Sequence, residues 1–465
     1  MSFAPGFRYA LLVVVAAWLG ASLLWEQELK AQSAGAQVKN LAQRVDGHDW
    51  PDFLGPSRDS KSQETGILTK WPARGLPLVW SHDLGVGYGI GAISRGRYFQ
   101  FDRFGNVARI YCLQSETGRE LWKFEYPCEY EDMLGYNNGP RCSPVVDGER
   151  LYAFGVEGML HCLRVTDGKL LWKRDTANDY GVVQNFFGVG STPIVVGDLL
   201  IAMIGGSPSD SPHVYSGRVQ GDGSGIVAFD KFTGKEKYRL SDELASYSSP
   251  ICRRVGDRLW CFAFARGGLL GFEPQAGKLD FHFPWRSAKL ESVNAATPII
   301  VGDSVFITET YGPGSAMLRV QPGNCDVVWQ DDERSRDKAM MAHWNTPIYH
   351  DGYIYASSGR HTANAELRCI RASDGEVQWS EPGLTRCSLL YADGHLICLS
   401  EDGALRLLRA TPEKFDEVSE MIPRDGAGLD RLLEYPAWAA PVLSHGLLYV
   451  RGKSKLLCFE LIPQR

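Results

Sequence analysis

The sequence predicts an all-β fold, an eight-bladed β-propeller of four-stranded antiparallel blades. Two short phrases that recur along the chain predict the strands, and the composition agrees with them. Glycine accounts for 50 of the 465 residues, which is above the usual share of roughly 7%. There are also 13 tryptophans. Tight glycine turns between strands that are anchored by aromatic residues explain both counts.

The first recurring phrase is a small residue, a proline, two apolar residues, a glycine-containing turn and an aromatic strand. It reads SPVVDGERLY at 143–152, TPIVVGDLLI at 192–201 and TPIIVGDSVF at 297–306, and it returns at 249–260, 346–355 and 440–449. Two alternating apolar runs around a tight turn are typical of a β-hairpin. Each occurrence therefore predicts the first two strands of a unit.

The second phrase is a strand, a turn that contains glycine, and an aromatic residue four positions after this glycine. The aromatic residue is Trp122, Trp172, Tyr238, Phe281 or Trp379, and in GNCDVVW it is Trp329, which lies six positions after its glycine. Together the two phrases give four strands per unit, which is the pattern of a propeller blade.

The ends of the chain complete the ring. Residues 88–122 form the first blade, and residues 385–418 read as a blade that has lost its aromatic residue. The last unit, 439–461, stops after its third strand, and PLVWSHDL at 77–84 can supply the fourth, with Trp80 in the aromatic position. Closing the ring removes exposed sheet edges. The count is eight blades, or seven if 385–418 is not one.

Several of the 11 cysteines share one position in the repeat. Cys112, Cys162 and Cys369 each lie ten residues before the tryptophan of their blade, and Cys458 looks equivalent, whereas Arg319 departs from the pattern. We expect these cysteines to be buried free thiols that pack as small apolar residues. No CxxC or HExxH motif occurs, so neither a zinc site nor an attached haem is expected.

Two cysteine pairs are candidates for disulfides. A turn centred on Gly256 places Cys252 opposite Cys261, and Cys128 and Cys142 flank one loop. Either pair could be bonded or free in an oxidising compartment.

The N-terminal segment predicts export. Residues 9–25 carry no charge, with Arg8 before them and Glu26 after them, which fits an N-in, C-out orientation. Residues 1–25 are thus a helical signal peptide or an inner-membrane anchor, and both remain open. We assign residues 26–49 to a tether, 50–75 to an extended leader and 76–465 to the propeller. The protein is expected to be periplasmic or otherwise extracytoplasmic.

The candidate site is the funnel formed by the loops between blades and by the loops between the second and third strands. These loops collect polar and aromatic side chains, which is typical of a ligand site. The ligand-binding candidates are Asn138, Arg141, Arg266, Asn294, Glu309, Trp344, Arg360 and His361. The alternative interpretation is that they satisfy buried backbone groups near the channel. A net charge of −6 gives no support for a nucleic-acid partner.

The Gly-x-x-x-Trp phrase resembles the tryptophan-docking repeat of the PQQ-like, or quinoprotein dehydrogenase-like, propellers over about residues 76–462. The segment WPDFLGPSRD at 50–59 resembles the leader of secreted bacterial proteins of the BamB-like type. The resemblance implies a monomeric, non-catalytic binding or scaffold propeller on the outer side of a bacterial membrane, with a protein or polymer at the funnel face. No cysteine precedes Cys112, so a lipobox is absent and membership of the assembly machinery is not implied.

Two other functions remain as alternatives. Relatives that are enzymes hold PQQ and calcium in the funnel, where Glu309, Asn294 and Glu291 would supply oxygens and Arg266 or Arg360 the cation. The adjacent cysteine pair that caps PQQ in alcohol dehydrogenases is absent, so no catalytic residue and no metal ligand is assigned. A carbohydrate-binding propeller is the second alternative, in which exposed aromatic residues stack on sugar rings. These are Tyr136, Phe186, Phe187, Tyr247, Trp344 and Trp438.

Overall fold

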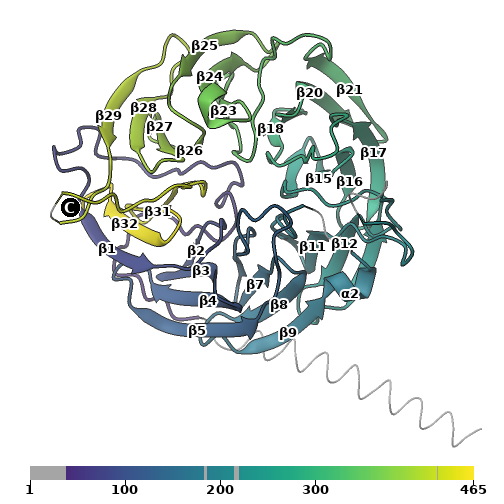
Figure 1. Cartoon of the computed structure of the whole chain (residues 1–465), viewed down its shortest axis with the longest axis horizontal. Helices are drawn as coiled ribbons and strands as arrows, with labels where there is room; N and C mark the ends of the chain where they lie inside the picture. Colours follow the sequence, from purple (N-terminus) through teal and green to yellow (C-terminus); the bar gives the residue numbers. More distant parts are fainter. Residues whose placement is uncertain (1–37, 183–185, 214–218, 427, 465) are drawn as a thin grey trace, which may run out of the picture. The chain divides into compact units, whose positions relative to one another are not determined.

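The computed structural model describes residues 38–182, 186–213, 219–426 and 428–464. The chain divides into two compact units, residues 1–40 and Leu41–Arg465. The predicted N-terminal helix lies outside the described residues, and none of the helices that are described has the length and apolar character to cross a membrane. The second unit is a ring of eight four-stranded antiparallel sheets (Figure 1), which confirms the predicted fold class and blade count.

In each of the first seven blades the strands follow one another in chain order from the central channel to the outer wall. Blade 1 is β2 (Ala92–Ser94), β3 (Arg97–Phe104), β4 (Val107–Gln114) and β5 (Glu120–Pro127). Blade 2 is β6 (Val145–Asp147), β7 (Arg150–Phe154), β8 (Met159–Arg164) and β9 (Leu170–Asp175). Blade 3 is β10 (Ile194–Val196), β11 (Leu199–Met203), β12 (Ile226–Asp230) and β13 (Glu236–Leu240). Blade 4 is β14 (Ile251–Val255), β15 (Arg258–Phe264), β16 (Gly268–Glu273) and β17 (Lys278–Pro284).

The second half of the ring repeats this order. Blade 5 is β18 (Ile299–Val301), β19 (Ser304–Glu309), β20 (Gly314–Gln321) and β21 (Asn324–Gln330). Blade 6 is β22 (Ile348–His350), β23 (Tyr353–Ser358), β24 (Glu366–Arg371) and β25 (Val377–Pro382). Blade 7 is β26 (Cys387–Ala392), β27 (His395–Ser400), β28 (Leu405–Arg409) and β29 (Glu417–Met421). Two short helices, α2 (Thr176–Tyr180) and η1 (Thr362–Asn364), lie in loops.

Blade 8 is built from both ends of the propeller. Its inner strands are β30 (Val442–Ser444), β31 (Leu447–Arg451) and β32 (Lys455–Glu460), and its outer strand is β1 (Leu78–Asp83). Trp80 of β1 is opposite Cys458 of β32. This pairing confirms the predicted closure of the ring, and it leaves no gap between the first and last blades.

The outer-strand tryptophan of one blade contacts the next blade. The indole N–H of Trp80 donates to the carbonyl of Ser115 in blade 1 at 2.9 Å. Trp122 makes the same bond to Val165 of blade 2, also at 2.9 Å. The repeated aromatic residue is therefore what joins neighbouring sheets, through an apolar ring and one hydrogen bond.

Glycine is required beneath the docked ring. Gly118 has φ +71, which favours glycine, and a Cβ atom added there would lie 2.8 Å from the Trp80 indole. A real Cβ would collide with the ring or displace it. Gly168, Gly234, Gly277 and Gly375 lie beneath a docked ring in the same way, whereas a Cβ at Gly323 would meet no atom within 4 Å.

Two blades depart from the repeat. In blade 7, Ser419 takes the position opposite Leu407 that the docking residue has elsewhere, and its hydroxyl accepts from the backbone N–H of Trp71 at 3.2 Å. In blade 5, Met317 and not Arg319 is opposite Trp329. Arg319 departs from the pattern, as the sequence indicated, because the β20–β21 hairpin is longer, which moves the register by two residues.

The cysteines behave mainly as small core residues. Cys112, Cys162, Cys369 and Cys458 are fully buried, and each is opposite its blade's docking tryptophan. All 11 cysteines are free thiols.

The two candidate disulfide pairs are free as well. Cys252 is opposite Cys261 in the β14–β15 pairing, as the turn predicted. The Cys128 thiol instead contacts a Glu157 oxygen at 3.2 Å, and the Cys142 thiol contacts the Ser191 carbonyl at 3.2 Å.

The leader lies against the inner strands of the ring. Trp50, only 2% exposed, pairs with Ile93 of blade 1, and Lys61 pairs with Tyr391 of blade 7. Between them Arg58 donates to the carbonyl of Val195 in blade 3 at 3.1 Å. The leader therefore crosses the channel, as the purple trace in Figure 1 shows. These contacts lie near the turns that join the first and second strands of the blades, on the face opposite the funnel.

The segment just before the leader also contacts the propeller. Arg44, which was expected to belong to a tether, pairs with Glu460 at 2.6 Å, and His445 pairs with Asp49 at 3.2 Å. These two ion pairs hold the segment against the last blade, and single charged contacts of this kind leave no periodic signal in the sequence.

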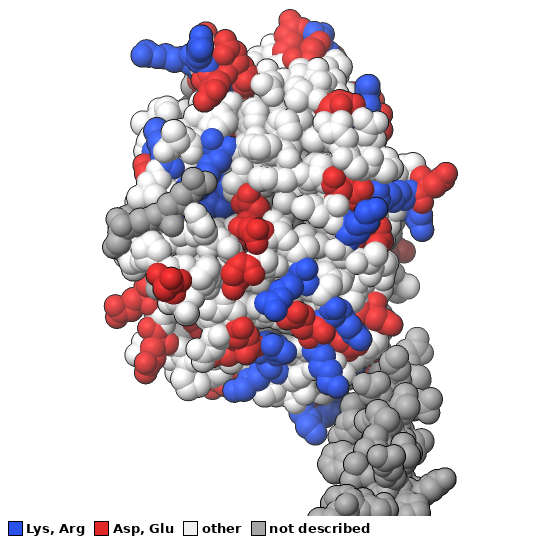
Figure 2. Space-filling model, turned by 90° about the vertical axis from the view of Figure 1, so that its right-hand side faces the viewer, with Lys and Arg blue, Asp and Glu red and all other residues white. Residues whose placement is uncertain are grey.

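The outer wall has no face of a single charge sign in the view of Figure 2. Acidic and basic side chains lie next to one another there, with broad neutral areas between them.

Candidate functional site at the funnel face

All eight predicted site residues lie on the loops of one face, which we call the funnel face. Asn138 and Arg141 follow β5, Arg266 follows β15, Asn294 follows β17, Glu309 ends β19, Trp344 follows β21, and Arg360 and His361 follow β23. The funnel face consists of the loops between blades and the loops between second and third strands.

The loop between blades 1 and 2 is built around Asp132. Arg141 forms an ion pair with this carboxylate at 2.7 Å, and the Asp132 side chain is fully buried. The Asn138 side chain accepts from the Asp132 backbone N–H at 2.8 Å. The guanidinium of Arg141 lies over the rings of Tyr88 and Phe187, 5.6 and 5.5 Å from their centroids. Arg141 therefore fixes this loop to its neighbours.

A row of rings crosses the funnel face. Tyr88 packs on Trp438 with 4.7 Å between ring centroids, and Trp438 packs on Trp344 at 4.6 Å. Trp344 in turn contacts His343 at 5.2 Å, and His343 contacts Tyr311 at 5.6 Å. These residues come from four different loops, so the row holds the loops of several blades together.

An ion pair that the sequence analysis missed supports this row. Arg386 bonds both carboxylate oxygens of Glu401, the shortest at 2.7 Å. Its guanidinium lies 4.4 Å from the Trp344 ring centroid and 5.3 Å from that of Trp438. Burial acts to raise the pKa of Glu401, but hydrogen bonds from Arg386 and two neighbours outweigh it, so the pKa lies below its ordinary value.

The sequence contained a signal for this arginine. Arg386 immediately precedes Cys387 at the start of a blade, as Arg141 precedes Cys142, and both pairs continue with serine. The signal was weak because blade 7 has lost its docking aromatic residue, which obscures its alignment with blade 2.

Glu309 and Arg360 meet at Tyr311. Glu309 is 1% exposed, and its carboxylate accepts from the Tyr311 backbone N–H at 2.8 Å and from the Ser292 hydroxyl at 3.0 Å. Burial raises the pKa of Glu309 to about 7. The Arg360 guanidinium lies 4.3 Å from the centroid of the Tyr311 ring and 3.7 Å from Glu291.

Glu309 should make stability depend on pH. Its pKa is about 7 in the folded protein against an ordinary value of 4.5, so the folded state binds the proton more tightly. The stabilising contribution of the protonated Glu309 is fully present below pH 4.5. It is lost as the pH rises through about 7, and the free energy of unfolding then falls by about 3 kcal/mol. In thermal melts between pH 4 and 8, the melting temperature of Glu309→Gln should therefore exceed that of the wild type by a margin that grows as the pH rises. Parallel melting curves would contradict this, and Glu291→Gln is the exposed control.

Two predicted residues stabilise their own loops. The Asn294 side chain is fully buried and donates to the carbonyls of Ala265 and Trp285 at 2.8 and 3.0 Å. His361 is exposed, and its backbone N–H bonds the Asn364 side chain at 2.9 Å, at the start of η1. For both, hydrogen bonding within the loop accounts for the position.

The structure thus brings four of the eight residues into contact with one row of rings or with its end residues. Arg141, Trp344, Glu309 and Arg360 belong to one set, through the row of rings that begins at Tyr88 and ends at Tyr311. Arg266, Asn294, Asn138 and His361 lie outside this row.

The expectation of an exposed aromatic surface was wrong for most of its members. Phe186 is 1% exposed, whereas Tyr136 is 66% exposed. Phe187, Tyr247, Trp344 and Trp438 are half-buried. The rings pack on one another and on arginines, because this buries more apolar area than facing water does. Little is left to stack on a sugar.

The donor set does not fit calcium and PQQ. The Glu309 carboxylate accepts from a backbone N–H and a hydroxyl. The Asn294 amide nitrogen donates to two carbonyls, and its Oδ1 atom, which has no hydrogen-bond partner among the described residues, is a single oxygen where calcium needs six or more. Among the residues that are described, no three His, Cys, Asp or Glu side chains gather as a metal would need. Phe186, Val293 and Tyr311 pack together at the funnel, where a flat quinone would need space. No redox step follows from this arrangement.

Tryptophan docking between the blades of an eight-bladed ring defines the class of PQQ-like repeat propellers. The chain belongs to the family described as outer membrane protein assembly factor BamB, whose sequence model matches residues 77–207 and 108–381. The outer membrane protein assembly factor BamB of Shewanella oneidensis is 29% identical over 436 residues, covering 88% of this chain and 94% of that protein.

Solved structures share the fold. BamB from Moraxella catarrhalis has a TM-score of 0.56 at 12% identity, covering 84% of this chain and 99% of that one. Quinohemoprotein alcohol dehydrogenase from Comamonas testosteroni has a TM-score of 0.63 at 13% identity, covering 93% of this chain and 84% of that one. At such identities the likeness shows the fold alone.

Proposed function

We propose that this protein is a non-catalytic binding propeller that holds a protein partner at its funnel face, on the outer side of a bacterial membrane. The observation that carries the proposal is the surface of the loops between blades. Leu134, Tyr136, Leu290, Leu429 and Tyr435 are 46, 66, 46, 75 and 54% exposed. Large apolar side chains exposed on several loops of one face are typical of an interaction surface.

The charged groups of the funnel face support this interpretation. Arg141 is paired with Asp132, and Arg386 with Glu401. They serve to order the loops, while Tyr136 and its apolar neighbours face outward. Interface cores are enriched in tyrosine and depleted of charge, so the surface suits a protein better than a polar small molecule.

The relatives indicate where the partner is found. Proteins of this family carry the name of an outer membrane assembly factor, and residues 9–25 predict export. We therefore place the protein outside the cytoplasmic membrane, with a partner among the proteins of the bacterial envelope.

Site-specific photocrosslinking tests the proposal. Tyr136 and Leu290 would each be replaced by a photoreactive phenylalanine in intact cells, with Leu170 and Val328 as controls. The controls are 38 and 41% exposed but lie on the outer strands β9 and β21. We expect both funnel-face positions to give an adduct with the same envelope protein, and neither control to do so.

Two results would overturn the proposal. One is adduct formation from the control positions but not from the funnel face. The other is saturable binding of PQQ with calcium together with alcohol or sugar oxidation that Arg360→Ala abolishes, since this would show an enzyme. With the partner in hand, Tyr136→Ser should weaken binding by roughly tenfold to a hundredfold, as expected for a central aromatic contact.

A further inference from the structure

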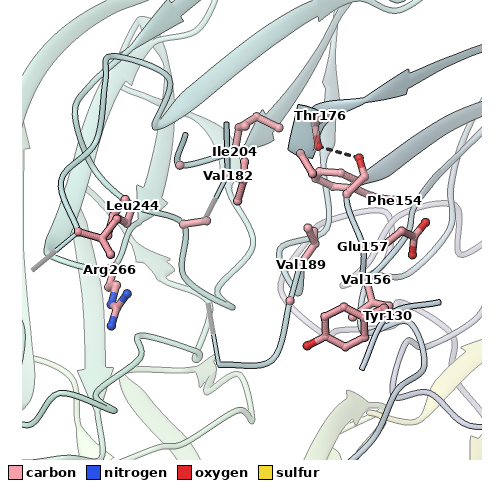
Figure 3. Close-up of a pocket in the computed structure, with 16 residues that line it drawn as sticks. Tyr130, Phe154, Val156, Glu157, Thr176, Val182, Val189, Ile204, Leu244 and Arg266 are labelled. Atoms are coloured by element: carbon pink, nitrogen blue, oxygen red, sulfur yellow. Dashed lines mark hydrogen bonds between the residues drawn. The ribbon is translucent and has the colours of Figure 1, made fainter. Parts of the chain in front are cut away.

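A cavity lies among the loops of the funnel face, and no ring of the row lines it. Its volume is about 310 Å³, which is within the range of small-ligand pockets. Loops and strand ends of blades 2, 3 and 4 line it, as Figure 3 shows. Val156, Val189, Ile204 and Leu244 give it a largely apolar wall.

Arg266 lines one end of this cavity. The residue is 5% exposed. Its guanidinium contacts the Leu290 carbonyl at 3.3 Å and lies 5.4 Å from the Phe186 ring centroid. Its Nε atom has no hydrogen-bond partner, and no ion pair joins it to an acid within the described part of the chain.

The Glu243 carboxylate offsets part of the Arg266 charge from a distance, but its direct contacts are with other groups. The Glu243 carboxylate pairs with His282 at 3.0 Å and accepts from the Gly267 N–H at 2.7 Å. Burial, and then the charge of Arg286, lower the pKa of Arg266 to about 10, so the side chain stays protonated at neutral pH. A buried cation is stabilised when an anion binds beside it.

The other end of the cavity has the opposite charge. Glu157 and Tyr130 lie across the cavity from Arg266 (Figure 3). A ligand with one negative group would be repelled from the Glu157 end and attracted to the Arg266 end. The walls between the two favour an apolar body.

We propose that this cavity binds an apolar molecule that ends in a single carboxylate, with the carboxylate on Arg266 and the apolar part along Val156, Ile204 and Leu244. Two sources share this chemistry, a free medium-chain fatty acid and the C-terminus of a polypeptide whose last residues are apolar. The proposal does not depend on a partner at Tyr136, since it concerns a different part of the funnel face.

Calorimetry on the purified protein at pH 8 tests the proposal with defined probes. Octanoate represents the free acid, and acetyl-valyl-leucine represents the polypeptide end. Octanol and the dipeptide amide are the uncharged counterparts. We expect saturable binding of at least one acid, and binding of its uncharged counterpart that is weaker by about tenfold or more, because a charge-assisted hydrogen bond is lost.

Single substitutions test whether Arg266 is the residue that holds the carboxylate. Arg266→Gln should lose about tenfold or more in affinity for the acid, whereas Arg266→Lys should keep most of it. Leu244→Phe narrows the cavity, so it should weaken the binding of the acid and of its uncharged counterpart alike. Arg254→Gln is the matched control, because Arg254 is exposed on β14 of the same blade. Melting temperatures would verify that each variant is folded.

The outcomes are distinct. Binding of octanoate alone, or of the dipeptide alone, supports the proposal and identifies the source. Absence of saturable binding by both acids overturns it, as does equal binding of the acids and their uncharged counterparts. Unchanged affinity in Arg266→Gln would overturn the assignment of the carboxylate to this residue.

Discussion

Replacement of Trp80 by alanine should lower the free energy of unfolding by about 3–5 kcal/mol, the usual range for removal of a buried tryptophan. Trp80 is 8% exposed. It packs on Tyr98 and Tyr449, with 6.1 and 5.9 Å between ring centroids. It also joins blade 8 to blade 1, so its loss removes the contact that closes the ring. Chemical denaturation followed by tryptophan fluorescence and circular dichroism measures the effect.

Conservative replacement separates the two contributions of Trp80. Trp80→Phe keeps a ring over Gly118 but loses the bond to the Ser115 carbonyl, worth about 1 kcal/mol, and part of the buried indole, so the loss should lie between about 1 kcal/mol and that of Trp80→Ala. Gly118→Ala, in the blade on which Trp80 packs, should also lower the free energy of unfolding, because the added Cβ meets the Trp80 ring. If Trp80→Ala cost less than 1 kcal/mol, Trp80 would not be the residue that closes the ring.

Breaking the ion pair between Arg386 and Glu401 should have an effect of similar size. The Arg386 and Glu401 side chains are 12 and 1% exposed. Glu401→Gln leaves the guanidinium charge buried beside two indole rings without its carboxylate, and loss of one member of a buried pair costs about 3–5 kcal/mol. The melting temperature should fall, and the loops between blades 6, 7 and 8 should exchange their amide hydrogens faster.

A double-mutant cycle identifies the source of this effect. Arg386→Met with Glu401→Leu removes both charges, so the double variant should be more stable than the sum of the two single losses predicts. The Asp402 carboxylate provides the control, because its pair with Arg431 is about 40% exposed on both sides and Asp402→Asn should change stability by less than about 1 kcal/mol. Additive losses for Arg386 and Glu401 would contradict a direct interaction.

The repeat made most of the fold predictable. The glycine turn and the aromatic residue recur at fixed spacing, and each strand pairs with the one next to it in the chain. Even the closure by Trp80 could be inferred, since the last unit lacked a strand. The register at Met317 could not be predicted, because it depends on the length of one hairpin and not on the repeated phrase.

The candidate site was predictable as a face but not as a set of contacts. Topology alone places Arg141, Glu309 and Arg360 on the same side of the ring. Whether an arginine meets a ligand, a carboxylate or a ring depends on loops without periodicity. Arg386 and its partner Glu401 show this, since the two residues come from different loops of blade 7.

The sequence by itself determined the class of fold, the number of blades and the residue that closes the ring, because the strands pair locally and every blade repeats the same phrase. Only the tertiary structure decided the path of the leader past Trp50 and Lys61, the pairing of arginines with aromatic rings, and the exposure of Tyr136. The physical reason is that these features depend on contacts between residues far apart in the chain, and such contacts are selected by burial and charge rather than by spacing.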